Sequence, residues 1–334
     1  MQLETRRIGR TDLAVTVLGF GGAQLGAVGD RLSDAEAHEI LTAAWERGIR
    51  YFDTAPLYGH GLSEKRIGAF LKNMPRDEFV LGTKVGRLLV PEGQGVRDEM
   101  MRDSEGLSVR YDYSYAGARA SIEASLVRLG MDRVDVLLCH DIDRWTHGTK
   151  QTEIFSSAAR GILPALMDLR AEGVVGAVGL GVNEAAVCER VLSEFDVDCF
   201  LLAGRFTLLE QDPLDALLPM CQERGVSIIV GGPYNSGLLA NVKRRRATYN
   251  YKPVDDVRWE RAQRLRAVCD AHGVDLRAAA LQYPLRHSAV AAVIPGMWSL
   301  AEVDDNRSFV GTDIPDSLWR DLTAQNLVRD PTAN

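Results

Sequence analysis

Short apolar runs alternate with amphipathic stretches along the whole 334-residue chain. The apolar runs are nearly continuous, as expected for parallel strands that are buried on both faces. Eight such strands are predicted, at residues 15–20, 49–53, 79–84, 134–140, 174–182, 198–203, 226–232 and 290–296. Between them, apolar residues recur at the three- and four-residue spacing of helices.

Two of the predicted helices carry clear start signals. Ser33-Asp34-Ala35-Glu36 has the form of a capping box before an apolar helical face. Asp212-Pro213 predicts an N-cap followed by a first-turn proline, and Gly225 is placed to end that helix.

Eight strand-and-helix units without a break in composition predict a single domain over residues 1–334, an α/β fold of the (β/α)8 TIM-barrel type. An open, doubly wound parallel sheet is the alternative, because periodicity does not distinguish the two. The connections at about 86–114 and 233–256 are long, and long loops in compact domains tend to be functional.

Composition and charge exclude several classes of protein. The formal net charge of −7 argues against a nucleic-acid surface, which requires clustered positive charge. The basic run Lys243-Arg244-Arg245-Arg246 is a local exception, which we interpret as a solvated loop. No apolar run reaches the roughly 18 residues of a membrane span, and the N-terminus lacks the apolar segment of a secretory signal. These features predict a cytoplasmic protein.

The five cysteines, at positions 139, 188, 199, 221 and 269, show no CxxC pair and no zinc-ligand spacing with histidine. Scattered cysteines in an odd number predict reduced and mostly buried thiols. No metal site is predicted.

Ionisable residues stand where three consecutive apolar strands end. Asp53 closes the second strand, Lys84 the third and His140 the fourth, and Tyr58 lies in the turn after Asp53. In a barrel these strand ends share one rim, where active sites of this fold lie. Each residue alone could have a purely structural role, such as a buried ion pair or a surface ring, but the four together favour a catalytic role.

The four groups suit proton transfer by a tyrosine. A free tyrosine has a pKa of about 10, and a nearby ammonium would lower that pKa by favouring the phenolate. Asp53 would pair with Lys84, and His140 would orient the substrate oxygen. Because these side chains supply no electrons, hydride transfer requires a bound cofactor.

The runs GIRYFDTAPLYG (48–59), TKVGR (83–87) and LLCHD (137–141) strongly resemble the aldo-keto reductases, and the likeness covers nearly the whole chain. The resemblance implies that Asp53, Tyr58, Lys84 and His140 form the catalytic tetrad. It also implies an N-terminal β-hairpin that closes the barrel floor and a dinucleotide that lies across the rim without a Rossmann motif.

The resemblance also implies a set of cofactor contacts, with Asn183 on the carboxamide. They are Gly21, Gly22, Asn183, Gly232, Pro233, Tyr234, Asn235, Gly237, Pro295, Gly296, Ser299, Glu302, Asp305 and Asn306. Two positions depart from the family pattern: Ala203 replaces a glutamine, and Gly231 replaces an aromatic residue that contacts the nicotinamide. Tyr234 is the candidate to compensate.

The residues expected at the adenosine end of the cofactor predict a preference for NAD over NADP. In NADP-preferring relatives a lysine and an arginine bind the 2′-phosphate, and the matching positions here are Gly296 and Glu302. Glu302 would repel a phosphate or accept a hydrogen bond from a free 2′-hydroxyl. The alternative is that Glu302 only completes a capping box with Ser299.

The same motifs resemble the aldose 1-dehydrogenase branch of the family, which includes L-fucose, D-threo-aldose and L-galactose dehydrogenases, with pyridoxal 4-dehydrogenase close by. This implies oxidation of the anomeric carbon of an aldose to the lactone, with Tyr58 as general base and with Tyr58, His140 and Trp145 contacting the substrate. The alternatives are a pyridoxal 4-dehydrogenase, an NADPH-dependent carbonyl reductase and, in a different class, a dinucleotide-binding regulatory subunit. The sequence does not predict the oligomeric state.

Overall fold

The computed structural model describes residues 2–26, 32–96, 106–240, 243–244 and 247–332. Eight parallel strands form its central sheet, in the order β14-β11-β10-β9-β8-β5-β4-β3. They are β3 (Phe20–Gly21), β4 (Tyr51–Asp53), β5 (Val80–Val85), β8 (Val136–His140), β9 (Ala177–Val182), β10 (Cys199–Ala203), β11 (Ser227–Gly231) and β14 (Val290–Ile294).

The two ends of this sheet meet and close it into a barrel. Leu18 bridges to Val293 and Gly21 bridges to Gly296, both in parallel. The amide of Gly19 donates to the Val293 carbonyl at 2.9 Å. The closed ring confirms the (β/α)8 barrel and excludes the open doubly wound sheet, which would leave two free edges.

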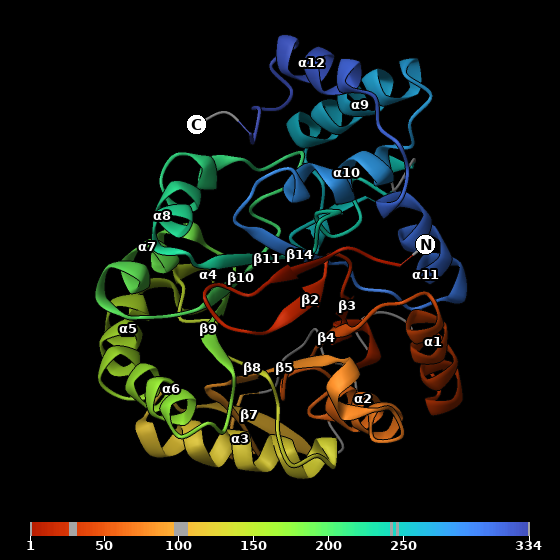
Figure 1. Ribbon diagram of the computed structural model, residues 1–334. Helices are drawn as coiled ribbons and strands as arrows, with labels where there is room; N and C mark the ends of the chain where they lie inside the picture. Colours follow the sequence, from red (N-terminus) through yellow and green to blue (C-terminus); the bar gives the residue numbers. More distant parts are fainter. Residues whose placement is uncertain (1, 27–31, 97–105, 241–242, 245–246, 333–334) are drawn as a thin grey trace.

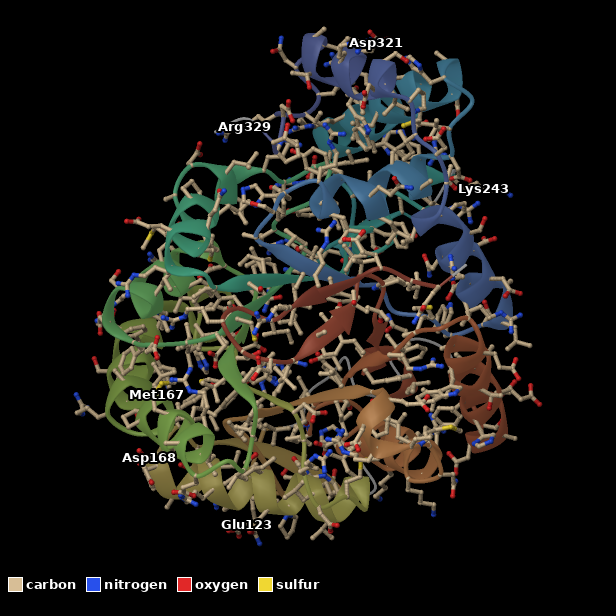
Figure 2. All side chains as sticks on the ribbon, viewed as in Figure 1. Glu123, Met167, Asp168, Lys243, Asp321 and Arg329 are labelled. Atoms are coloured by element: carbon tan, nitrogen blue, oxygen red, sulfur yellow. The ribbon has the colours of Figure 1, made fainter. Side chains whose placement is uncertain are left out.

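Helices surround the ring of strands (Figure 1). Their bounds are α1 (Asp34–Glu46), α2 (Leu62–Leu71), α3 (Tyr115–Leu129), α4 (Arg144–His147), α5 (Gln151–Arg160), α6 (Ile162–Ala171), α7 (Ala185–Glu194), α8 (Leu217–Arg224), α9 (Asp256–Ala271), α10 (Leu276–Leu285), α11 (Leu300–Val310) and α12 (Asp316–Ala324). Their outer faces carry charged side chains such as Glu123 on α3 and Asp321 on α12 (Figure 2). No helix in the described ranges is both long and apolar enough to cross a membrane.

An N-terminal hairpin crosses the barrel on the side opposite the carboxyl ends of the strands, as predicted. It consists of β1 (Thr5–Arg7) and β2 (Ala14–Thr16), which pair antiparallel, and it lies across the ring in Figure 1. The Gly9 amide donates to Ser227 Oγ at 2.8 Å, at the start of β11. Ile8 and Val15 pack with the interior of the barrel, so the hairpin closes the floor with apolar side chains.

The prediction of one strand over residues 15–20 was wrong. Residues 14–16 belong to the floor hairpin, and the barrel strand β3 covers only Phe20–Gly21. The apolar run is continuous because both segments are buried. A hydrophobic pattern alone therefore does not reveal the change of direction between them.

The helix signals were right at one site and wrong at another. Ser33 and Glu36 form the predicted capping box at the start of α1. Asp212 does not cap a helix: it begins a 3₁₀ turn (Asp212–Leu214), and α8 starts only at Leu217. Gly225 ends α8 as predicted, with a left-handed φ of 63° that suits glycine.

The two long connections contain short antiparallel pairs. The first holds β6 (Arg87–Pro91) paired with β7 (Leu107–Tyr111), and residues 97–105 between them lie outside the described part. The second holds β12 (Thr248–Tyr249) and β13 (Lys252–Pro253). Within the basic run, Lys243 is exposed at the edge of the molecule (Figure 2). Arg244 pairs with Asp256, and residues 245–246 are outside the described ranges.

Candidate active site

Asp53 and Lys84 meet at the carboxyl ends of the neighbouring parallel strands β4 and β5. Lys84 Nζ donates to Asp53 Oδ2 at 2.5 Å and to the Thr54 carbonyl at 2.9 Å. Both side chains are almost completely buried, at 1% and 3% exposure. Such a pair requires both charges, because removal of one would leave the other buried and uncompensated.

Tyr58 lies against this pair, in the turn between β4 and α2. The amide of Ser63 donates to the Tyr58 carbonyl at 3.1 Å, which anchors the turn to the start of α2. Lys84 Nζ is 4.8 Å from the centroid of the Tyr58 ring. The His140 ring meets the Tyr58 ring edge-on, with centroids 6.0 Å apart and an interplanar angle of 89°. The structure therefore brings all four predicted catalytic residues together.

The pKa of Tyr58 departs from the sequence prediction. Burial raises the pKa of Tyr58 to about 12, although the Lys84 ammonium lowers it as predicted. The negative charge of the Asp53 carboxylate also raises the pKa of Tyr58. Tyr58 is therefore a protonated phenol at neutral pH in this state, because loss of solvation outweighs the single nearby cation.

Lys84 and His140 hold opposite protonation states. Burial favours a neutral Lys84 amine, but the Asp53 carboxylate and Tyr58 overcome that effect and raise the pKa of Lys84 above its usual value. Burial and the charges of Arg87 and Lys84 lower the pKa of His140 well below its usual range. Lys84 is thus a cation and His140 a neutral imidazole, which can donate from one nitrogen and accept at the other.

The sequence analysis missed an ion pair directly beside the tetrad. Arg87 Nη2 donates to Asp141 Oδ2, and both side chains are nearly buried. Asp141 Oδ1 accepts from Asn183 Nδ2 at 3.0 Å. Arg87 and Asp141 stand in TKVGR and LLCHD, the motifs that identified Lys84 and His140, but their pairing across 54 positions depends on the folded rim.

The first and last segments of the predicted cofactor contacts lie together at the rim. Gly21 pairs with Asp53 in the sheet and bridges to Gly296. Gly22 packs so closely that an added Cβ would lie 2.6 Å from the Asp53 carbonyl oxygen. At Gly296 an added Cβ would overlap the Gln24 side chain. Gln24 is therefore a rim residue that the sequence analysis did not identify.

The loop after β11 places its polar residues toward α11. Gly232 and Gly237 have left-handed φ values of 57° and 89°, which allow the loop to turn at both ends. Asn235 Nδ2 donates to the Gly204 carbonyl at 3.0 Å, and Asn235 Oδ1 is buried without a partner among the described residues. This buried acceptor belongs to a residue that the family resemblance places among the cofactor contacts.

Tyr234, the predicted substitute for the aromatic residue missing at Gly231, is bonded to α11. Its hydroxyl bonds to Asn306 Oδ1 on α11, so its ring is held against that helix. Ala203 and Gly231 are register partners at the ends of β10 and β11. These strand ends therefore carry a methyl group and a hydrogen atom instead of an amide and a ring.

Glu302 caps its helix in an unexpected way. Ser299 is the N-cap of α11, and its side chain accepts from the Glu302 amide. Glu302 does not return to the Ser299 amide, however, so the capping box is incomplete. Its carboxylate accepts from the Trp298 amide at 2.9 Å and from Trp298 Nε1 at 3.0 Å, while Asp305 pairs with Arg277 at 2.7 Å.

Two exposed aromatic rings stand on loops at the carboxyl ends of the strands. Trp145 is 50% exposed on α4 after β8, and Tyr251 is 64% exposed in the connection after β11. Surrounding protein and the Asp141 carboxylate nevertheless raise the pKa of Tyr251. Arg205 lies 5.6 Å from the Trp145 ring and donates to Asn250 Oδ1 at 3.2 Å.

The cysteine side chains add no reactive group to this site. All five cysteines are free and buried, and burial raises the pKa of Cys139 well above its usual value, so it is not a reactive thiolate. The described residues contain no group of three His, Cys, Asp or Glu side chains that could hold a metal.

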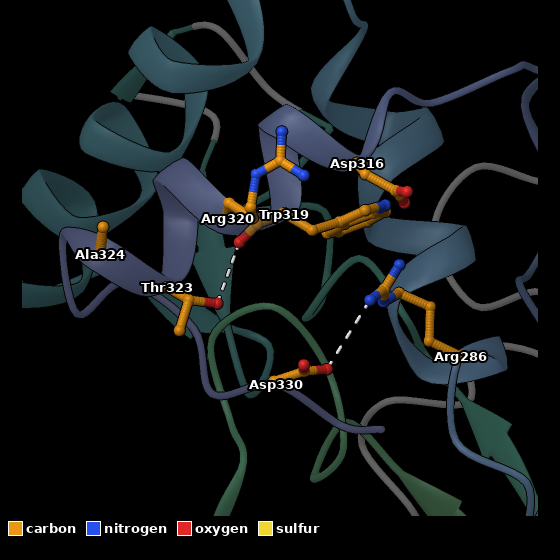
Figure 3. Close-up of a pocket in the computed structure, with 7 residues that line it drawn as sticks. All are labelled: Arg286, Asp316, Trp319, Arg320, Thr323, Ala324 and Asp330. Atoms are coloured by element: carbon orange, nitrogen blue, oxygen red, sulfur yellow. Dashed lines mark hydrogen bonds and ion pairs between the residues drawn. The ribbon is translucent and has the colours of Figure 1, made fainter. Parts of the chain in front are cut away.

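A hollow of about 440 Å³ opens beside α12 (Figure 3). Its lining contains none of the predicted site residues and consists of Arg286, Asp316, Trp319, Arg320, Thr323, Ala324 and Asp330. Within it, Arg286 stacks on Trp319 and approaches Asp330 at 3.6 Å.

Comparisons with known proteins agree with this geometry. Residues 17–326 match the model of the aldo/keto reductase family. A D-threo-aldose 1-dehydrogenase from Pseudomonas sp is 41% identical, with 96% of each chain covered. A pyridoxal 4-dehydrogenase from Microbacterium luteolum is 39% identical, with 97% of this chain and 98% of the relative covered. The holo form of an aldo-keto reductase from Bacillus halodurans superposes with a TM-score of 0.76 at 28% identity, over 99% of this chain and 98% of the other.

Proposed function

The chain belongs to the aldo/keto reductase family and is an oxidoreductase, and from this premise we propose that it is an NAD-dependent aldose 1-dehydrogenase. It acts as one domain over residues 1–334 in the cytoplasm and oxidises the anomeric carbon of an aldose such as L-fucose or a D-threo-aldose to the lactone. The observation that carries the proposal is the placement of Tyr58 against both the Lys84–Asp53 pair and His140.

The proposed catalytic roles follow from these contacts. Tyr58, beside the Lys84 cation, takes the proton of the anomeric hydroxyl as its phenolate. Lys84 stabilises that phenolate, and Asp53 keeps Lys84 charged and in place. His140, as a neutral imidazole, hydrogen-bonds the same substrate oxygen. A nicotinamide bound at this rim would supply the acceptor for the hydride lost when the anomeric carbon is oxidised to the lactone carbonyl.

The rim residues fit a nicotinamide dinucleotide, the cofactor class of aldo/keto reductases. The amide group of Asn183 donates to the carboxylates of Asp141 and Asp143, which directs its carbonyl oxygen away from them as an acceptor. The buried Asn235 Oδ1, in the loop after β11, is a second acceptor without a partner among the described residues. Both acceptors suit the amide and hydroxyl donors of a dinucleotide.

The charges near α11 support NAD rather than NADP. Arg277 is shared between Asp275 and Asp305, with contacts of 2.8 and 2.7 Å. The Glu302 carboxylate adds a further negative charge on the same helix as Asp305. These four side chains carry a net negative charge, which would oppose the binding of a 2′-phosphate.

The charges around the tetrad support an uncharged substrate. Lys84 is paired with Asp53 and Arg87 with Asp141, so neither cation is available to bind a phosphate or carboxylate. Trp145 and Tyr251 supply exposed aromatic faces at the rim, and such faces pack against the C–H groups of a sugar ring. A neutral cyclic aldose fits both features.

The experiment is an assay of reduced-nicotinamide formation from L-fucose, D-arabinose, L-galactose and pyridoxal, each with NAD and with NADP. We expect rapid turnover of at least one aldose, with a higher kcat/KM for NAD. Turnover of pyridoxal alone would support the second candidate, a pyridoxal 4-dehydrogenase, which the identity to the Microbacterium luteolum enzyme favours. Activity only as NADPH-dependent carbonyl reduction, or tight dinucleotide binding without turnover, would refute the proposal.

A further inference from the structure

Asp141 has an unusual backbone conformation next to the catalytic histidine. It follows His140 at the end of β8 and has a left-handed φ of 45°. Residues other than glycine rarely adopt this conformation without supporting contacts. Here the Asp141 amide donates to the Gly181 carbonyl at 2.9 Å. The Asp141 carbonyl accepts from the Tyr113 hydroxyl at 2.6 Å and from His147 Nε2 at 2.8 Å.

The carboxylate that this conformation places at the rim contacts three functional side chains. Asp141 Oδ1 accepts from Asn183 Nδ2 at 3.0 Å. Asp141 Oδ2 accepts from Arg87 and lies 3.4 Å from His140 Nε2. One carboxylate therefore links the proposed carboxamide ligand, Asn183, to the proposed substrate ligand, His140.

The orientation of the Asn183 amide follows from these contacts. A carboxylate only accepts hydrogen bonds, so the NH2 group of Asn183 must face Asp141. The backbone amide of Asn183 also donates to Asp143 Oδ2 at 2.6 Å, and Asp143 is itself fixed as the N-cap of α4. Two acidic side chains thus fix both the backbone and the side chain of Asn183.

Arg87 completes the arrangement by compensating the charge of Asp141. Burial raises the pKa of Asp141 to about 6, and the adjacent guanidinium acts against that rise. Arg87 also lies 5.2 Å from the Tyr111 ring, so its planar group has a fixed position.

We propose that Asp141, held by Arg87, is a positioning residue that fixes the Asn183 amide as a hydrogen-bond acceptor at a set distance from His140. This inference rests on the proposed use of a nicotinamide cofactor. Asp141 does not touch the reacting atoms. It acts through Asn183, so its effect on dinucleotide binding must depend on that side chain.

The test is a double-mutant cycle on NADH binding, measured by fluorescence titration of the purified protein without substrate. Asp141→Asn replaces an acceptor by an amide that can also donate, so Asn183 loses its single orientation. Because hydrogen bonds to charged groups are stronger than those between neutral groups, we expect Asp141→Asn to weaken NADH binding by about tenfold, which corresponds to about 1.4 kcal/mol. In the Asn183→Ala background the same change should have almost no effect.

The matched control is Asp168→Asn, which removes an exposed carboxylate that contacts Tyr115 and should leave NADH binding unchanged. The proposal would be overturned if Asp141→Asn weakened NADH binding equally in both backgrounds, or if it weakened NADH binding in neither. If Asp141→Asn is not recovered folded, Arg87→Lys is measured in the same two backgrounds, and additive effects there would overturn it as well. Failure of the unaltered protein to bind NADH would instead overturn the proposed function.

Discussion

The Lys84 ammonium lies 4.8 Å from the centroid of the Tyr58 ring and remains charged because Asp53 accepts its hydrogen bond. The proton affinity of Tyr58 is therefore lowered by an adjacent charge that Asp53 keeps in place.

Replacement of Tyr58 by phenylalanine removes the proposed proton acceptor and keeps the ring. We expect kcat to fall by about a hundredfold to ten-thousandfold, the usual contribution of a general base, while the Kd for NADH stays nearly constant. Steady-state kinetics and fluorescence titration provide the two values. The control is Tyr115→Phe, which removes an exposed hydroxyl bonded to Asp168. Retention of most of the activity in Tyr58→Phe would place the base elsewhere.

The pH profile follows from the raised pKa of Tyr58. Because burial raises that pKa to about 12, the phenolate is scarce at neutral pH and its fraction grows with rising pH. The kcat/KM for aldose oxidation should therefore increase from neutral toward alkaline pH, by up to about tenfold per pH unit below the pKa. In Lys84→Met the cation that lowers the pKa of Tyr58 is lost, so the rise should shift to higher pH. A profile independent of pH, or a shift in the opposite direction, would contradict this role of Lys84.

Glu302 should contribute to the discrimination between NAD and NADP. Glu302→Gln removes a negative charge near the proposed 2′-position, keeps the size of the side chain and retains one oxygen to accept from Trp298, although the second Trp298 N–H loses its acceptor. Because an exposed charge interaction contributes about 1 kcal/mol, we expect the Kd for NADP to improve by about fivefold and the Kd for NAD to change little. Asp304→Asn, on the same helix but paired with Arg47, is the control. Tighter binding of NADP than NAD by the unaltered protein would contradict the charge argument.

The exposed rings at the rim should bind substrate and not cofactor. Trp145→Ala and Tyr251→Ala each remove one proposed wall of the substrate site, so the KM for the aldose should rise by about threefold to tenfold, which corresponds to about 0.5–1.5 kcal/mol for an aromatic contact. The Kd for NADH should not change. Val127→Ala, at an 81% exposed position on α3, controls for the loss of exposed apolar surface. An unchanged KM in both aromatic variants would exclude these rings from the substrate site.

The contact between α2 and α3 gives a prediction about stability. A Cβ added at Gly68 would lie 2.0 Å from the Leu129 carbonyl oxygen. The backbone of α2 or α3 would have to shift to relieve this overlap. Gly68→Ala should lower the free energy of unfolding by about 1–3 kcal/mol. At Gly311 the nearest atoms are 3.5 Å or more from the added Cβ, so Gly311→Ala should leave stability nearly unchanged. Urea denaturation of both variants distinguishes the two sites, and equal midpoints would contradict the packing argument.

The position of the tetrad could be predicted from the sequence because parallel strands place their carboxyl ends on one rim. Asp53, Lys84 and His140 close three consecutive apolar runs, so their proximity follows from topology alone. The Arg87–Asp141 pair could not be predicted in this way. It depends on the left-handed backbone at Asp141 and on the rotamer of Arg87, which no periodic pattern records.

The pKa of Tyr58 and the hydrogen-bond partner of Glu302 also could not be predicted from the sequence. The effect of Lys84 on the pKa of Tyr58 has the predicted direction, but the extent of burial decides the outcome and becomes known only from the packed rim. The partner of Glu302 is a comparable case. The spacing from Ser299 predicted a capping box, yet both oxygens accept from Trp298, whose ring position depends on tertiary packing.

The closure of the barrel by Gly21 and Gly296 has a consequence for biosynthesis. All four tetrad residues are present once the first 140 residues have been made, but the strand that closes the ring, β14, begins at Val290. Contacts between such distant positions form slowly and late in folding. A nascent chain therefore carries these four residues well before its ring of strands can close, so the closed rim should form only after β14 has been synthesised.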